Sequence, residues 1–130
     1  MTPHFAVDEW RCKDGTPYPE KWIDDRLRVL CAQLEIIRHA CGDRVITILS
    51  GYRTPSYNAA IDGADNSQHC HGRAADIRVE GMAPSDVHKM ILFLFEAGKI
   101  EIGGLGIYSG WCHLDIRPRP ASGHLARWSG

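Results

Sequence analysis

Residues 63–80 read GADNSQHCHGRAADIRVE and carry the pattern around which the rest of the chain can be organised. Between residues 63 and 76, two imidazoles and two carboxylates lie among small residues, which let a backbone fold closely around an ion. From Ala74 to Glu80, apolar and charged residues alternate, which predicts a half-buried strand with Asp76 on its polar face. His69 on the preceding loop and Asp76 can therefore meet at one metal ion. The alternative is a surface loop histidine and an aspartate in an ordinary surface ion pair.

Two helices are predicted on either side of this segment. Apolar residues recur at alternating spacings of four and three between Pro19 and Cys41, which predicts a helix there, with Gly42 suited to its end. Helical spacing recurs between Pro84 and Gly98, where a proline at the start and a glycine at the end also favour a helix. Both apolar stripes are expected to face the core.

Further strands are predicted before and after the second helix. Val45 to Leu49 is a nearly all-apolar run rich in β-branched residues, which predicts a strand covered on both faces. Glycines between residues 103 and 110 predict a hairpin-like region that leads into a strand from Cys112 to Arg117. In that strand His113 and Asp115 share one face, whereas Cys112 points into the core. The order of elements predicts an α+β fold, with a largely antiparallel sheet packed with helices.

Size and composition indicate one domain spanning residues 1–130. The chain has 15 basic and 16 acidic residues and shows no basic cluster, so no nucleic-acid partner is expected. The longest apolar run, residues 90–95, is far too short to span a membrane. Five cysteines without a Cys-x-x-Cys pair are typical of reduced thiols and argue against a disulfide framework.

Three separated motifs resemble those of the zinc D-Ala-D-Ala carboxypeptidase family of murein peptidases. They read SGYRTPxxN (residues 50–58), GAxxSQHxxGxAADI (63–77) and CHxDxR (112–117). FxxDEWxC (5–12) and the pair RW (127–128) also resemble the short single-domain branch of that family, so the resemblance covers nearly the whole chain. It implies a hedgehog/DD-peptidase-like fold. Because hedgehog signalling domains share that fold and a similar zinc site, fold and metal do not by themselves establish catalysis.

The resemblance implies a zinc site formed by His69, Asp76 and His113. Two neutral imidazoles and a carboxylate leave a fourth tetrahedral position open for water, which is the arrangement of a catalytic zinc site. Arg53 matches the family's cleft arginine and is implied to bind a substrate carboxylate or the developing oxyanion. The alternative for Arg53 is a structural arginine that braces the loop before Pro55.

One position departs from the family pattern. Many members carry an acidic general base three residues before the distal histidine, and that position here is Gly110. Asp115 shares a strand face with His113 and is our predicted replacement for the base. The alternative is that the Asp115 carboxylate orients the histidine ligand.

The resemblance therefore implies a zinc-dependent peptidase that hydrolyses peptidoglycan stem peptides, as a D-Ala-D-Ala carboxypeptidase or a murein endopeptidase. The alternative is a catalytically silent, zinc-stabilised module that binds cell-wall fragments or a protein partner. The N-terminal residues MTPHFAVDE lack a basic region followed by an apolar one, so no export signal is expected. We expect cytoplasmic synthesis, followed by release on lysis, carriage by a phage particle, or action on soluble wall fragments.

Overall fold

The computed structural model of the chain describes residues 1–130 and contains a five-stranded mixed sheet with three α-helices. The strands lie in the order β1-β2-β4-β3-β5. Their bounds are β1 (Ile46–Ser50), β2 (Ala74–Val79), β3 (Gly104–Ile107), β4 (Cys112–Asp115) and β5 (Ala126–Ser129). Every neighbouring pair is antiparallel except β3 and β5, which run parallel. The predicted mixture of helices with a largely antiparallel sheet is therefore confirmed.

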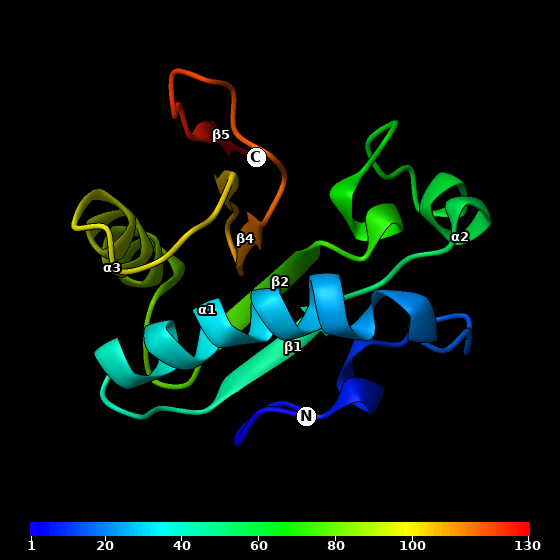
Figure 1. The fold of residues 1–130 in the computed structure, drawn as a ribbon, viewed down its shortest axis with the longest axis horizontal. Coiled ribbons are helices and arrows are strands. Elements are labelled where there is room, and N and C mark those ends of the chain that lie inside the picture. The colour runs from blue at the N-terminus through cyan, green and yellow to red at the C-terminus, as the bar shows by residue number, and fades with distance from the viewer.

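The helices are α1 (Arg28–Ala40), α2 (Pro55–Ala60) and α3 (Pro84–Glu96). Figure 1 shows α1 running across β1 and β2, with α3 at one end of the molecule. The buried faces of α1 and α3 join one hydrophobic cluster with alternate residues of the strands, among them Ala75 and Ile77 of β2 and Leu114 of β4. This cluster leaves the opposite face of β2 and β4 available for polar side chains.

The helix predicted from Pro19 is only partly α-helical. A 3-10 turn at Glu20–Trp22 and a π turn at Ile23–Leu27 precede α1. Hydrophobic spacing does not distinguish the wider π turn from an α turn over so few residues. The π turn carries Arg26, whose Nη1 donates to the His71 carbonyl at 2.7 Å.

The prediction that the first strand is covered on both faces is wrong. Only one face of strand β1 is covered: Ile46 and Ile48 are buried, whereas Thr47 between them is exposed, and Val45 just before the strand is 56% exposed. Strand β1 also lies at the edge of the sheet. A run of β-branched residues indicates a strand but does not reveal its place in the sheet.

One α-helix and one strand of the structure lie outside the predicted set. Helix α2 begins with Pro55 directly after Thr54, whose side chain accepts a hydrogen bond from the Tyr57 amide at 3.2 Å. A Thr-Pro pair is a recognisable helix start, so this short helix did have a sequence signal. Strand β5 lacks one, because its four residues pair in parallel with a strand about twenty residues away.

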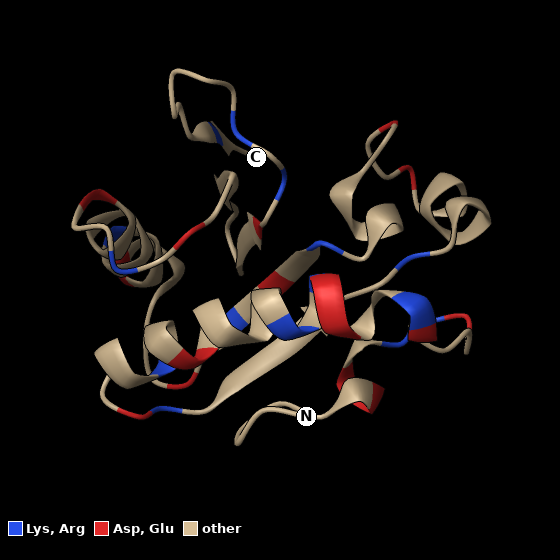
Figure 2. Ribbon diagram, viewed as in Figure 1, with Lys and Arg blue, Asp and Glu red and all other residues tan.

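All five cysteines are free thiols in the structure, and Cys112 lies in the core with its Sγ 3.2 Å from the Pro84 carbonyl. Charges of both signs are spread along the ribbon in Figure 2. None of the helices combines the length and the apolar character needed to cross a membrane.

Candidate metal centre

Sheet register brings two of the predicted ligands together. Asp76 on β2 and His113 on β4 are paired residues of neighbouring antiparallel strands. Their side chains therefore share the face of the sheet that points away from the hydrophobic core. His69 comes from a 3-10 turn at Gln68–His71 that precedes β2. Gly72 ends this turn at φ 67°, a left-handed conformation that favours glycine.

The three side chains form a compact, buried cluster. His69 Nε2 lies 3.3 Å and His113 Nδ1 lies 3.0 Å from the same oxygen, Asp76 Oδ1. One ligand atom from each residue lies within 4.8 Å of the other two, and all three residues are buried. Two imidazole nitrogens and a carboxylate oxygen are a donor set that suits zinc and leaves a position open. The residues present therefore fit the ion that the sequence implies.

His69 is oriented by the backbone. Its Nδ1 lies 2.7 Å from the Gly51 carbonyl oxygen, which can only accept a hydrogen bond, so Nδ1 carries the proton and Nε2 has the free lone pair. Burial lowers the pKa of His69 below its ordinary value, although Asp76 opposes this shift. His69 is therefore neutral near pH 7, the state in which an imidazole binds a metal.

His113 is oriented from its other side by Asp115. Its Nε2 lies 2.8 Å from Asp115 Oδ2, which leaves Nδ1 directed toward Asp76. Asp115 is fully buried and accepts hydrogen bonds from Nε and Nη2 of Arg117 at 2.8 and 2.6 Å. Of the two roles open for Asp115, this geometry favours orientation of the ligand, because the His113 ring separates the Asp115 carboxylate from the metal-facing nitrogen.

The carboxylates and His113 are coupled electrostatically. Burial alone would raise the pKa of the Asp115 carboxyl, but hydrogen bonds from Arg117 and His113 lower it to about 2. Burial alone would lower the pKa of His113, but hydrogen bonds to Asp115 and Asp76 raise it above its ordinary value. Burial alone would also raise the pKa of the Asp76 carboxyl, but its hydrogen bond with His113 holds that pKa well below the usual range. The two carboxylates therefore favour the protonated form of His113, whereas metal binding requires its neutral form.

Two glycines of β3 make room for this arrangement. A Cβ atom at Gly104 would collide with the Asp115 carboxylate, and one at Gly106 would collide with the Trp128 ring. These collisions explain why side chains are absent from the β3 positions that face the site. Trp128 of β5 lies against His113, with ring centroids 5.1 Å apart.

Arg53 lies beside the cluster and is held by three polar partners. Its Nε donates to Ser50 Oγ at 3.1 Å, Nη1 to Asn58 Oδ1 at 3.2 Å, and Nη2 to Asp76 Oδ2 at 3.2 Å. The contact with Asp76 uses the oxygen that does not face the histidines, so Arg53 orients the carboxylate without occupying Oδ1. The side chain is 15% exposed and lines the cavity. Its role in substrate engagement stays a prediction.

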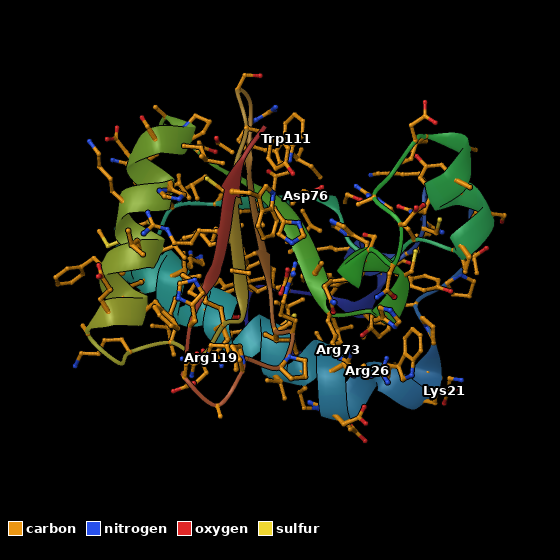
Figure 3. The ribbon with its side chains drawn as sticks, turned by 90° about the horizontal axis from the view of Figure 1, so that it is seen from above. Lys21, Arg26, Arg73, Asp76, Trp111 and Arg119 are labelled. Atoms are coloured by element: carbon orange, nitrogen blue, oxygen red, sulfur yellow. The ribbon has the colours of Figure 1, made fainter.

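A cavity of about 430 Å³ opens over the three predicted ligands. Tyr108 and Trp111 form part of its wall and stack with centroids 4.7 Å apart, and Trp128 Nε1 donates to the Tyr108 hydroxyl at 2.8 Å. Trp111 and Asp76, which both line the cavity, are labelled near one another in Figure 3. These aromatic residues were not predicted as site residues. The pair RW in the resemblance was the available signal for Trp128.

Other polar residues near the metal motif are placed differently. Asp65 lines the same cavity, whereas Glu101 lines a separate one. His71 Nε2 lies 2.8 Å from Asn66 Oδ1 and does not belong to the three-residue cluster. No acidic side chain stands at Gly110, which lies in the β3–β4 connection.

Two imidazoles and one carboxylate at the floor of a cavity form a site of the class found in zinc hydrolases. The chain belongs to the Peptidase M15 family, whose sequence profile matches residues 3–115.

Two curated relatives are similar to parts of the chain. The zinc D-Ala-D-Ala carboxypeptidase of Streptomyces albus G is 44% identical over 45 residues, which are 35% of this chain and 18% of that protein. The peptidoglycan L,D-endopeptidase MepK of Escherichia coli K12 is 31% identical over 80 residues, which are 56% of this chain and 41% of that protein. The matches therefore span less than half the length of either relative.

Proposed function

We propose that this chain is a zinc-dependent peptidase that hydrolyses peptidoglycan stem peptides, either as a D-Ala-D-Ala carboxypeptidase or as an endopeptidase. The observation that carries the proposal is the buried cluster of His69, Asp76 and His113 under a cavity, in a member of the Peptidase M15 family. The relatives' names, a D-Ala-D-Ala carboxypeptidase and a peptidoglycan L,D-endopeptidase, support the substrate class. We further propose that the fold is of the hedgehog/DD-peptidase type, as the resemblance implies.

The residues of the site would have different roles in such a reaction. His69 Nε2, Asp76 Oδ1 and His113 Nδ1 would hold the zinc ion. When bound, zinc polarises a carbonyl and lowers the pKa of a coordinated water to about 7. Arg53 stands at the cavity wall with a planar guanidinium that can bind a carboxylate or an oxyanion.

Metal analysis combined with purified muropeptides tests the proposal. We expect one zinc per chain and the release of cleavage products, which mass spectrometry of the digest would identify. Addition of a chelator is expected to abolish the cleavage. The bond that is cut would separate carboxypeptidase from endopeptidase activity. A protein that held zinc and bound muropeptides without cutting them would instead be the silent binding module.

Replacement of Arg53 by lysine is expected to lower kcat/KM for a muropeptide at least about tenfold while leaving zinc content unchanged. Lysine keeps a positive charge beside Asp76 but loses the planar fork that binds a carboxylate with two hydrogen bonds. Arg44→Lys is a matched control, because Arg44 contacts the Glu80 carbonyl beyond the far end of β2. Kinetics and metal analysis on the same preparations check this. Full activity of Arg53→Lys would contradict a role in substrate binding.

A further inference from the structure

A second cavity, of about 590 Å³, lies at the end of the sheet where β2 begins and β4 ends. Four arginines line it, and we call it the arginine cavity. Arg26 comes from the π turn before α1, Arg73 immediately precedes β2, and Arg117 and Arg119 follow β4. Figure 3 shows Arg26, Arg73 and Arg119 at this edge of the molecule, away from Trp111.

Positive charge in the arginine cavity is only partly neutralised. Two carboxylates, Asp25 and Glu101, also line it, and Glu101 is 2.8 Å from Arg119. Arg117 is paired with Asp115. Neither of the remaining arginines has a carboxylate oxygen within 4.0 Å. An anion that entered the cavity would therefore meet guanidinium groups that are not already paired.

Arg73 is the arginine with the most unused binding capacity. Its half-buried side chain makes no hydrogen bond or ion pair, although its backbone carbonyl accepts from the Ile116 amide at 3.0 Å. Arg26, in contrast, is fixed by its bond to the His71 carbonyl and by stacking over Trp22, with its guanidinium carbon 4.2 Å from the ring centroid. The cavity thus combines one unpartnered guanidinium with another that is held in place, which suits an anionic group with two acceptor oxygens.

Arg117 connects the arginine cavity to the metal centre. It lines both cavities, and its Nε and Nη2 hold Asp115, which in turn holds His113. An extended ligand that lay over the metal centre could therefore continue past Arg117 toward Arg73. Such a ligand could be a peptide that carries a free carboxylate some residues away from the bond that is cut.

We propose that the arginine cavity binds a carboxylate of the same peptide that is cleaved at the metal centre, with Arg73 and Arg26 as its donors. The inference rests on the proposed function, because it assigns the ligand as an acidic peptide substrate. A phosphate group has related acceptor chemistry. The peptide carboxylate is favoured because the cavity adjoins the metal centre through Arg117, so both can contact one extended chain.

The assignment can be tested with two synthetic peptide substrates that differ at one group. The acidic peptide carries a free carboxylate there, and the amide peptide carries a carboxamide in its place. With the zinc-loaded chain, Arg73→Gln is expected to lower kcat/KM for the acidic peptide by about ten- to a hundredfold, as for loss of charge-assisted hydrogen bonds. The amide peptide is expected to be cut by Arg73→Gln and by the parent at the same rate. Arg44→Gln, which removes a charge at the other end of β2, is expected to match the parent on both peptides.

Equal effects on both peptides, or no effect on either, would overturn the proposal. If the parent cut neither peptide, the proposed function would fail, but titration calorimetry would still test the cavity. Tighter binding of the acidic peptide by the parent, lost in Arg73→Gln and weakened by salt, would support it. Titration with inorganic phosphate distinguishes the other source of anion. Phosphate binding that required Arg73, with no preference for the acidic peptide, would assign the cavity to phosphate instead.

Discussion

Replacing His113 by alanine is expected to abolish zinc binding and peptidase activity while leaving a folded protein. The change removes one of three proposed ligand atoms, and His69 and Asp76 alone do not complete the three-ligand set of a catalytic zinc site. Loss of a group that merely orients a ligand weakens metal binding about ten- to a hundredfold. Loss of the ligand itself is therefore expected to lower zinc affinity by more than about a hundredfold. Competition with a chelator, followed by metal analysis, measures this change.

His39→Ala is the matched control for this experiment. Its side chain is 84% exposed on α1, outside the cavity over the ligands, so the variant is expected to keep one zinc per chain. Thermal melting of both variants without metal checks that each is folded. Stoichiometric zinc in His113→Ala under chelator competition would show that the ligand assignment is wrong.

Much of the fold could be predicted because most elements bury one regular face. The apolar residues of α1 and α3 recur with helical spacing and lie in one core, and the alternation in β2 and β4 separates Ala75 and Leu114 from Asp76 and His113. The edge position of β1 and the pairing of β5 could not be predicted. Both depend on which strands become neighbours, and that is decided by long-range contacts that local patterns do not encode.

Local sequence patterns also predicted only part of the candidate site. Alternation places His113 and Asp115 on one face of β4, but it does not reveal that Asp76 lies directly opposite His113. That register is a property of the folded sheet. The surroundings of Asp115 were equally hidden, because Arg117 folds back onto the carboxylate and β3 covers it with Gly104. Sequence alone therefore left open whether Asp115 acts as a base or orients His113.

Asp115→Asn is expected to weaken zinc binding by about ten- to a hundredfold and to recover most of its activity when zinc is added in excess. Asparagine has nearly the same shape as aspartate but no charge. One of the two carboxylate oxygens is replaced by an NH2 group, which cannot accept a hydrogen bond from Arg117. The hydrogen bond that fixes His113 Nε2 would therefore be weakened, and Nδ1 would be less well directed toward the metal. Activity measured against zinc concentration follows this effect.

The same titration separates the two roles of Asp115. If Asp115 were the general base, the rate would fall by about a hundredfold or more at saturating zinc, with zinc affinity nearly intact. The fully buried position of the carboxylate and its engagement with both His113 and Arg117 favour the first outcome. Asp43→Asn, which changes a carboxylate in the turn after α1, controls for loss of charge. Full activity of Asp115→Asn at ordinary zinc would exclude both roles, and the carboxylate would then serve only to pair Arg117 in the folded protein.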